Sequence, residues 1–457
     1  MMITRDKSFY RLMFSIALPI GIQNLITFTV SMADTMMLGT LGEVQLSASS
    51  IGNNLFFIMM VLMFGLGGGA GVMTAQYYGK KDTNAIHQIF AIMYKVCIMI
   101  SILFVIIAML VPKEFISIFT TDKLVISEGV KYLRIVAIGY VFYSLTNCTI
   151  NVLRSVQTVK ISMVVYSISL VVNVFFNWVF IFGNLGAEPM GVQGAAIATV
   201  IARIVEFIVV LVFMLFFEKK VKLRPKHFLN TNKLMVKDFI TNCTPVLFNE
   251  LLWGLGATMN SIIVGRMGTE VVAANSINNV CSQFVTVFIF GVGSASSVVI
   301  GNTIGEGKYS KAKEYAKTIS ILSVVMGLIS GIVVYSIRPI IVDFYNISES
   351  TKLIAMDIMT TTAIIVVFQS ISVNTMLGIL RGGGDNKFVL INDIIYMWLI
   401  AIPFGFIGAF VWKLPIVLLF LIIKSDEILK VIASVIRIIS GKWVNNVTRD
   451  FDNTDMI

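Results

Sequence analysis

The stretch PIGIQNLITFTVSMADTMMLGTLG at residues 19–42 has a gapless counterpart, PVLFNELLWGLGATMNSIIVGRMG, at residues 245–268. Each copy begins with a proline, continues as a long apolar run and ends in two glycines three residues apart. The offset of 226 residues holds as far as residue 82, and one residue later in the second copy Leu153-Arg154 aligns with Leu380-Arg381. Chance similarity between apolar segments would not keep glycines and prolines in register, so the sequence contains an internal repeat.

The composition decides the class of protein that carries this repeat. Of the 457 residues, 57% are hydrophobic and only 13% are charged, whereas soluble domains average about 45–50% and about 25%. Too few charges remain to cover water-facing surfaces, and disorder requires the opposite balance. The four cysteines are scattered without a CxxC pair, so the sequence predicts neither a metal site nor a disulfide framework. It predicts an integral membrane protein.

A membrane-spanning helix needs about 20 apolar residues, and twelve runs meet this length. They lie near residues 12–38, 46–74, 88–111, 130–152, 161–183, 192–216, 240–264, 271–300, 314–337, 353–378, 388–410 and 414–436. Six runs fall in each repeat copy, and six is even, so both copies enter the membrane from the same side. We therefore predict an all-α integral membrane fold with twelve transmembrane helices in two six-helix bundles, related by a pseudo-twofold axis along the membrane normal.

This count divides the chain into an N-lobe (1–217), a basic cytoplasmic linker (218–238), a C-lobe (239–437) and a cytoplasmic tail (438–457). With the N-terminus inside, 25 of the 35 Lys and Arg residues fall in cytoplasmic segments and 8 in outer ones. This bias obeys the positive-inside rule. The net charge of +10 therefore reflects helix orientation rather than nucleic-acid binding. We expect a multi-pass protein of the plasma membrane with both termini in the cytoplasm.

Two carboxylates lie inside predicted spans. Asp34 is late in the first helix and Glu250 is in the middle of the seventh, where an acidic side chain costs about 2.5–3.5 kcal/mol even on mild scales. In the repeat, Asp34 aligns with Asn260 and Glu250 with Asn24. Each half thus carries one acid where the other carries an amide, which favours two specialised sites. The alternative is a carboxylate satisfied by neighbouring hydroxyls or amides.

Asn173 and Asn177 are spaced four residues apart, so both amides lie on one face of the fifth helix, and we predict that they lie near Asp34. A carboxylate and two amides form a plausible site for a proton or a hard cation, although ordinary hydrogen bonding between helices would also explain the two asparagines. Arg203 and Glu206 are predicted to form an internal ion pair.

Three further ionisable residues lie at positions along the spans that predict where their side chains extend. Asp357 and Asp393 lie near predicted helix ends and are expected to reach the interface. Lys95, within the third span, is expected to extend its ammonium group toward the interface.

Several motifs together resemble the MATE family of multidrug and toxic-compound extrusion transporters. In chain order they are ALPIGIQNL, ADTMMLGTLG, AQYYGKKD, NWVFIFG with GVQGAAIATVIAR, GRMGTEVVAANSI, GNTIGEGK and ILRGGGDNK. The resemblance implies a twelve-helix antiporter that exports cationic or amphiphilic organic compounds in exchange for Na⁺ or H⁺ by a rocking, alternating-access motion. It implies no enzyme activity and no cofactor other than the coupling ion. We expect small organic cations and membrane lipid as partners, no nucleic acid, and a monomer.

By this resemblance Asp34 matches the first-helix aspartate of the family's N-lobe cation site. Asn173 and Asn177 match its fifth-helix partners, and Thr199 matches the sixth-helix threonine. Pro19 matches the proline at which the first helix is proposed to bend.

Glu250 matches the seventh-helix glutamate of a C-lobe site found in one branch of the family. With Asn249 and Asn374 it forms the predicted C-lobe site for an ion or a cationic substrate, facing the same cavity as Asp34. The sequence departs from that branch, because the tenth-helix aspartate is missing and Ser370, Ser372 and Asn374 stand in that region.

Two other functions are open at this point. A lipid-linked oligosaccharide flippase of the same superfamily would need a large cationic cavity, and the predicted membrane interior offers only Arg203 and Lys95 as cations. An integral membrane enzyme would need paired aspartates or a His–acid pair, which the spans do not supply. Both are disfavoured relative to an antiporter.

Overall fold

The computed structural model describes residues 3–224, 231–345 and 347–450. All regular structure in these residues is helical. In the first half the helices are α1 (Lys7–Gly39), α2 (Glu43–Lys80), α3 (Thr83–Leu110), α4 (Pro112–Ser117), α5 (Lys123–Val136), α6 (Gly139–Ser155), α7 (Lys160–Phe182), the short 3₁₀ turn η1 (Asn184–Gly186), α8 (Val192–Val212) and the π-helical η2 (Phe213–Phe217).

The second half continues with α9 (Lys233–Gly265), α10 (Thr269–Gly305), α11 (Tyr309–Phe344), α12 (Glu349–Val373), η4 (Asn374–Leu380), α13 (Asn386–Asp393), η5 (Ile394–Ala401), α14 (Ile402–Phe410), α15 (Ile416–Ile423) and α16 (Ser425–Ser440). The segments η4 and η5 are π-helical and continue the helices before them. Side-chain caps begin several helices: Asp6 accepts from Ser8 N at α1, and Asp82 accepts from Ala85 N at α3. Such caps satisfy backbone N–H groups that have no partner within the helix.

Among the described residues, nine helices are long and apolar enough to cross a membrane, and the pair α5 and α6, bent by 49°, makes up to ten. Two of the twelve predicted spans are not among them. The predicted span 240–264 corresponds to α9, which carries several polar residues, and 414–436 is divided between the short helices α15 and α16. The chain is therefore a multi-pass, all-helical membrane protein.

Two predicted boundaries differ from the structure. Helix α9 begins at Lys233, so the end of the segment 218–238 is helical rather than a linker. Helix α16 extends to Ser440, beyond the predicted start of the tail. Residues 225–230 of the linker and 451–457 of the tail lie outside the described residues.

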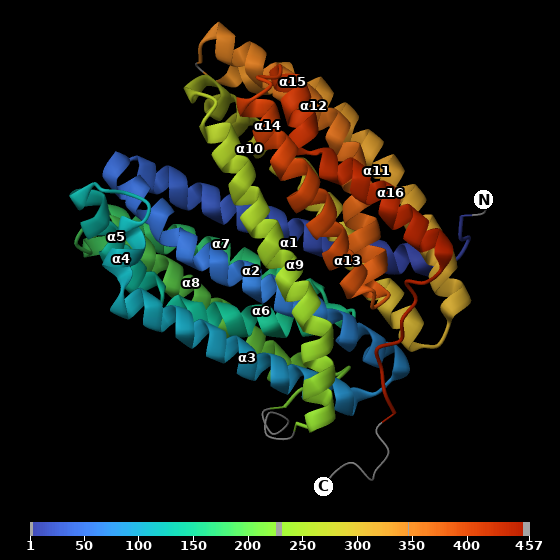
Figure 1. Cartoon of the computed structure of the whole chain (residues 1–457). Helices are drawn as coiled ribbons and strands as arrows, with labels where there is room; N and C mark the ends of the chain where they lie inside the picture. Colours follow the sequence, from blue (N-terminus) through green and yellow to red (C-terminus); the bar gives the residue numbers. More distant parts are fainter. Residues whose placement is uncertain (1–2, 225–230, 346, 451–457) are drawn as a thin grey trace.

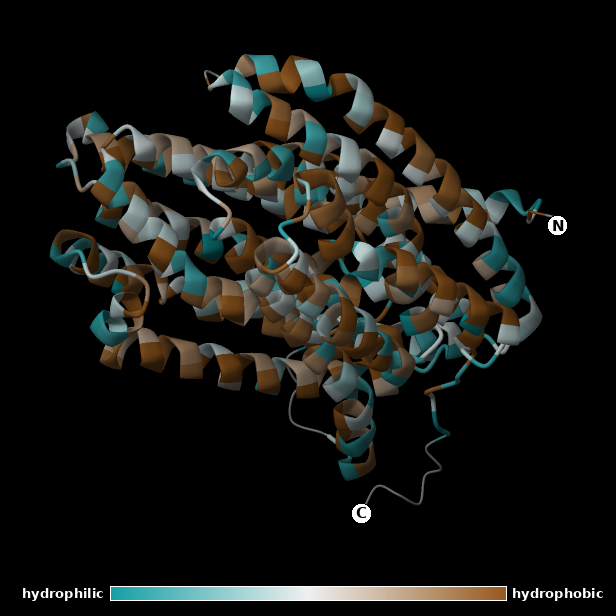
Figure 2. Cartoon of the chain, turned by 45° about the horizontal axis from the view of Figure 1, so that its top comes forward, coloured by the Kyte–Doolittle hydropathy of each residue, from teal (hydrophilic) through white to brown (hydrophobic). Residues whose placement is uncertain are grey.

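The helices of the first half (α1–α8) and those of the second half (α9–α16) diverge with distance from the chain termini (Figure 1). Apolar residues follow the lengths of the helices, and hydrophilic residues are concentrated near their ends (Figure 2). Helix α1 shows the divergence within one element: most of its buried residues lie between Phe9 and Gln23, and beyond Gln23 only Leu38 is buried. The two halves thus meet on the side of the termini and separate on the other side.

Glycines bring the backbones of the two halves into direct contact. A Cβ atom at Gly79 of α2 would collide with the carbonyl oxygen of Asn302 in α10, and a Cβ at Gly305 of α10 would collide with the carbonyl oxygen of Gln76 in α2. Helix α2 also packs on α9, where a Cβ at Gly69 would collide with the backbone of Cys243. Only glycine permits helices to approach so closely at these positions.

The segment 441–450, called the strap below, runs across the packed ends of α2 and α9. The backbone N–H of Val447 donates to Gln76 Oε1 at 2.8 Å, and Gln76 Nε2 donates to the carbonyl of Asn445 at 3.1 Å. Arg449 pairs with Asp238 of α9 at 2.6 Å, while Lys80 of α2 donates to the Arg449 carbonyl at 2.6 Å. The strap therefore joins the ends of α2 and α9.

Candidate functional site: a polar cavity beside Asp34

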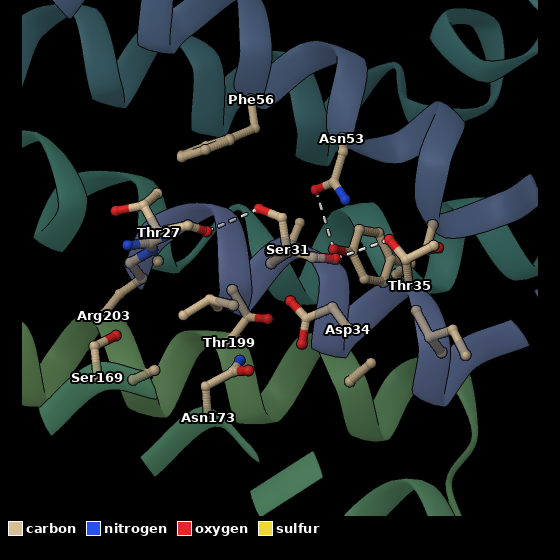
Figure 3. A pocket seen from close by; sticks show the side chains of 18 of the residues that line it. Thr27, Ser31, Asp34, Thr35, Asn53, Phe56, Ser169, Asn173, Thr199 and Arg203 are labelled. Atoms are coloured by element: carbon tan, nitrogen blue, oxygen red, sulfur yellow. Dashed lines mark hydrogen bonds between the residues drawn. The ribbon is translucent and has the colours of Figure 1, made fainter. Parts of the chain in front are cut away.

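A cavity of about 550 Å³ lies within the first half of the chain, between α1, α2, α5, α6, α7 and α8. Its lining includes Asp34, Asn173, Thr199, Arg203 and Glu206 together with hydroxyl and aromatic side chains. Asp34, Asn173 and Thr199 point toward one another across it (Figure 3). Three of the residues predicted for the N-lobe site therefore line one space.

The Asp34 carboxylate is held by neutral amides. Asn177 Nδ2 donates to Asp34 Oδ1 at 2.5 Å and also to Asn173 Oδ1 at 3.1 Å. The i,i+4 spacing on α7 produces this arrangement, because it stacks the two amides on one face of the helix. Asn173 and Asn177 are buried, and Asn177 Oδ1 has no hydrogen-bond partner among the described residues. The structure thus brings the fourth predicted residue, Asn177, into contact with Asp34.

These groups together offer the oxygen atoms that hard cations prefer. The carboxylate of Asp34, the amide oxygens of the two asparagines and the hydroxyl of Thr199 come from α1, α7 and α8. Carboxylate and carbonyl oxygens are the ligands that hard cations take in proteins. Among the described residues, none forms an ion pair with Asp34, so its charge is available to a ligand.

Arg203, the cation nearest to this group in the cavity lining, is already paired. Its Nη1 lies 2.8 Å from Glu206 Oε1, and Ser169 donates to the same oxygen at 2.5 Å. The guanidinium also lies over the ring of Tyr143, 5.0 Å from its centroid. The predicted internal ion pair is confirmed.

Sequence reasoning missed several residues of the cavity. Tyr132 lines it and donates to Asn53 Oδ1 at 3.1 Å, and Tyr166 and Phe56 add aromatic surface. These residues sit in apolar runs and carry no spacing signal that separates them from packing residues. The bend between α5 and α6, which brings Tyr132 to the cavity, was not visible in the hydrophobicity pattern.

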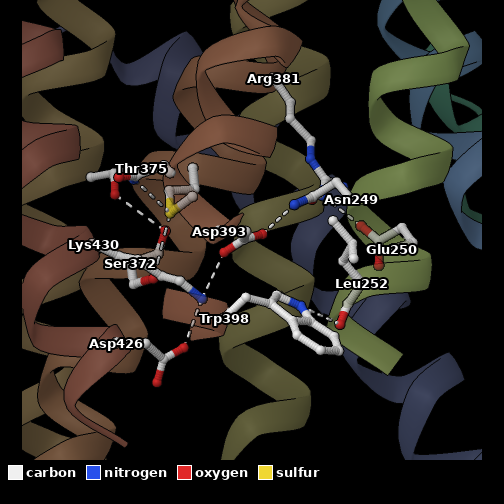
Figure 4. A network of polar contacts seen from close by, with 12 residues as sticks. Asn249, Glu250, Leu252, Ser372, Thr375, Arg381, Asp393, Trp398, Asp426 and Lys430 are labelled. Atoms are coloured by element: carbon white, nitrogen blue, oxygen red, sulfur yellow. Dashed lines mark hydrogen bonds and ion pairs between the residues drawn. The ribbon is translucent and has the colours of Figure 1, made fainter. Parts of the chain in front are cut away.

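A second polar cluster lies in the other half (Figure 4). Glu250 of α9 is buried and forms an ion pair with Arg381 Nη2 at 2.5 Å. Asn249 accepts from the same guanidinium and donates to Asp393. Lys430 of α16 lies 2.6 Å from Asp393 and 2.7 Å from Asp426. Polar and charged contacts thus link four parts of the second half: α9, the residue Arg381 that follows η4, α13 and α16.

One expectation for this half is wrong. Asp393 does not reach the interface but is buried, with its partners Lys430 and Asn249. Arg381 and Lys430 are buried as well, with only 6% and 4% of their surface exposed. The buried interior of the described chain therefore holds cationic side chains besides Arg203, and the sequence argument against a flippase, which counted only cations within the predicted spans, is weakened.

Glu250 also differs from its expected place. It is not among the described residues that line the Asp34 cavity; it packs against Gly65 of α2 instead, where the two halves touch. Asn374 is buried and donates to the Ser370 carbonyl at 2.7 Å within its own helix. No hydrogen bond between described residues joins Asn374 to Asn249 or Glu250, so the structure does not bring the three predicted C-lobe residues into one site.

Pro19, the predicted hinge, lies inside the continuous helix α1. It is buried where α1 crosses α10, next to Ala17, whose carbonyl oxygen would lie 2.9 Å from a Cβ at Gly291. Asp34 follows fifteen residues later, about 22 Å along the helix at 1.5 Å per residue. The proline is therefore in the contact between halves, and the carboxylate is in the diverging part.

The MatE family model matches residues 19–179 and again residues 245–407. The chain belongs to the MatE family. The two matches start 226 residues apart, the offset found in the repeat. Among curated relatives, the probable multidrug resistance protein NorM of Listeria monocytogenes is 25% identical over 402 residues, with 85% of each chain covered. The NorM protein of Thermotoga maritima is 24% identical over 440 residues, covering 94% of this chain and 92% of the relative.

Solved MATE structures share the fold. An outward-facing multidrug resistance MATE family transporter of the MOP superfamily superposes with a TM-score of 0.84 at 18% identity, covering 97% of this chain and 100% of the other. A MOP superfamily transporter from Pyrococcus furiosus gives 0.83 at 18% identity, with 97% and 98% covered. As a MatE protein the chain is a multi-pass membrane transporter related to multidrug resistance proteins, and not an enzyme.

Proposed function

We propose that this MatE protein is a secondary active antiporter of the plasma membrane. It exports cationic, amphiphilic organic compounds and takes up Na⁺ or H⁺ in exchange, acting as a monomer without a cofactor beyond that ion. Its twelve predicted spans form two six-helix lobes, residues 1–217 and 239–437, that rock about their contact. The side of the termini faces the cytoplasm, so the described conformation is open to the outside, like the outward-facing relative.

The observation that carries this proposal is the environment of Asp34. Its carboxylate lies in a large cavity, touches the Asn177 amide and lacks a cationic partner among the described residues. Of the charged residues lining the cavity, Asp34 and Glu206 are acidic and Arg203 is basic. The lining is therefore net negative, which favours a cationic cargo over the pyrophosphate of a lipid-linked sugar.

Exchange follows from competition for this carboxylate. An ion arriving from outside binds Asp34, Asn173, Asn177 and Thr199 and neutralises the charge that holds a cationic drug. Binding drives alternation only through a difference in affinity between the two conformations. Bending of α1 near Pro19 would transmit ion occupancy to the contact between the halves.

The C-lobe cluster has a different role in this scheme. Glu250 is held by Arg381, so an ion or a cationic substrate at Glu250 and Asn249 must displace a guanidinium. We propose that this exchange accompanies opening of the cytoplasmic side, because both residues lie near the contact of the halves. Asn374 contributes packing rather than ligation.

The test is efflux from proteoliposomes in which proton and sodium gradients are imposed separately. Asp34→Asn keeps the shape of the side chain and removes its charge, so we expect loss of gradient-driven ethidium efflux with unchanged folding. The matched control is Asp343→Asn, because the Asp343 side chain is 74% exposed and makes only a 3.8 Å ion pair. Normal efflux by the Asp34→Asn protein would refute the proposed role.

A further inference from the structure

A second, smaller cavity of about 60 Å³ lies between the two halves of the chain. Its lining comes from α2, α6, α10 and the end of η4, and includes two arginines, Arg154 and Arg381. One water molecule needs roughly 10–15 Å³ on this measure. The space therefore suits a few waters or one compact ion, and it is too small for the organic cations considered above.

The two arginines are equivalent positions of the internal repeat, one from each half. Arg381 belongs to the C-terminal half, and its Nη1 would lie 3.7 Å from a Cβ at Gly68, which also lines the cavity. Arg154 belongs to the N-terminal half and follows Asn151 on α6. Equivalent cations thus face one space where the repeat copies meet.

These guanidinium groups are incompletely partnered. Arg154 donates from Nη2 to the neutral Gln23 Oε1 at 3.3 Å, and in the described part of the chain no carboxylate lies within ion-pair distance of it. The Nε atoms of both Arg154 and Arg381 are buried without a hydrogen-bond partner in the same residues. Glu250 neutralises one of the two arginines, so one positive charge remains uncompensated.

The rest of the lining supplies donors and no negative charge. Ser294 and Ser297 of α10 line the cavity, and their hydroxyls make no hydrogen bond to other described residues. No Asp or Glu is among the lining residues that the structure describes. Two like charges repel strongly where the dielectric is low, and a guanidinium presents planar N–H donors that suit a carboxylate or another compact anion.

We propose that this cavity binds a compact monovalent anion, either a free halide or the carboxylate of a small molecule, between Arg154 and Arg381. Each half supplies one arginine, so the complete site exists only while the halves are in contact as described. The anion stabilises this conformation because it has no equivalent site when the arginines are apart. Binding itself does not depend on the transport activity proposed above.

The primary test is the thermal stability of the purified protein. Sodium concentration and ionic strength are held constant while gluconate, whose six-carbon chain exceeds the cavity, is replaced by chloride, bromide or acetate. We expect a saturable rise in Tm with the compact anions. A response to halides alone identifies an inorganic ligand, and a response to acetate as well identifies carboxylates. Equal Tm values in all four salts would overturn the proposal.

Variants assign the response to the cavity. Arg154→Gln should remove the anion-dependent rise in Tm, whereas Arg134→Gln, which changes an exposed arginine at the end of α5, should keep it. Arg154→Lys retains the charge without the planar fork and should show a weakened response. An undiminished response in Arg154→Gln would contradict the assignment.

A direct measurement covers the case in which Arg154→Gln does not fold. Crystals of the unaltered protein grown with bromide should show anomalous density between the guanidinium groups of Arg154 and Arg381. Bromide density elsewhere with none in this cavity would exclude the site.

Discussion

Glu206 and Arg203 form a buried ion pair in the lining of the Asp34 cavity. The Glu206 side chain is fully buried, and its oxygens accept from Arg203 and Ser169. Removing one member of a buried ion pair leaves an uncompensated charge, which costs about 3–5 kcal/mol, whereas neutralising both members costs much less. The pair therefore sets the charge of the cavity as well as its stability.

We predict that Glu206→Gln lowers Tm far more than the double change Arg203→Met with Glu206→Gln. The single change strands the guanidinium, and the double change removes both charges. Thermal unfolding of the two variants in the same detergent checks this order. A double variant less stable than Glu206→Gln would show that the ion pair does not behave as a buried unit.

Asp6 joins the start of α1 to the second half. Ser8 and the Tyr315 hydroxyl donate to its carboxylate, the latter at 3.0 Å, and these bonds lower the pKa of Asp6 from 3.8 to about 2. A depressed pKa means that the ionised form is favoured in the folded state. The contribution to stability is therefore complete above about pH 4 and is lost as the pH falls toward about 2.

Asp6→Asn should accordingly lower Tm at neutral pH, and the difference from the unaltered protein should shrink as the pH falls below about 4. The measurement is Tm for both proteins across a series of acidic buffers. A difference that stays constant with pH would mean that the carboxylate charge is not the source of the stabilisation.

At this scale, sequence reasoning found the groups whose spacing and cost signal a role. Asp34 is an acid inside an apolar run, and Asn173 and Asn177 share a helix face, so their contact could be predicted. The burial of Arg381, Asp393 and Lys430 could not be predicted, because charged residues near predicted helix ends resemble interfacial residues. Only the packing of several helices shows that they are buried.

At the scale of elements, glycine positions determine how α2 meets α10. Gly305 is the last residue of α10, and any side chain there would collide with the α2 backbone at Gln76. Backbone atoms cannot move aside as a flexible side chain can. Overpacking of this kind costs about 1–3 kcal/mol. This cost applies only to the conformation in which the two halves are in contact.

Gly305→Ala should therefore shift the population toward separated halves, by roughly 5-fold to 150-fold for a cost of about 1–3 kcal/mol. Spin labels on cysteines introduced at Lys81 and Lys308, near the ends of α2 and α10, report the distance between these ends. The four native cysteines are buried, which limits their labelling. We expect longer distances in the variant.

The matched control is Gly39→Ala, also at the end of a helix, where a Cβ would meet nothing within 4 Å. It should leave the distance distribution unchanged. Equal effects of the two substitutions would indicate loss of helix-end flexibility rather than a collision.

The hydrophobicity pattern predicted most long helices but not their interruptions. The π-helical segments η4 and η5 lie within apolar runs whose composition is that of an ordinary helix. The last predicted span is divided at Lys424 into α15 and α16, a break that a count of apolar residues does not capture.

For the whole molecule, the strap at 441–450 adds contacts that fix the relation of the halves. Trp443 is fully buried against Gly383, and Arg449 reaches both α9 and α2. Hydrogen bonds of this type contribute about 0.5–1.5 kcal/mol each. In the proposed alternation, these contacts of the strap would have to break before the side of the termini opens.

Deleting residues 442–457 should lower Tm and lengthen the distance between labels at Lys81 and Lys308. Deleting only 451–457, which lie outside the described residues, leaves the strap in place and serves as the control. If the long deletion left the distance distribution unchanged, the strap would not restrain the two halves.

The contact between α2 and α10 is reciprocal: Gly79 faces Asn302, while its repeat equivalent Gly305 faces Gln76, the equivalent of Asn302. Reciprocity of this kind defines an isologous interface, the type that joins identical subunits in a twofold dimer. Two copies of a half-length ancestral chain, inserted with the same orientation, could pair through this surface without further adaptation. Duplication and fusion of its gene would then have freed each copy to diverge, one keeping the acid at position 34 and the other the acid at position 250.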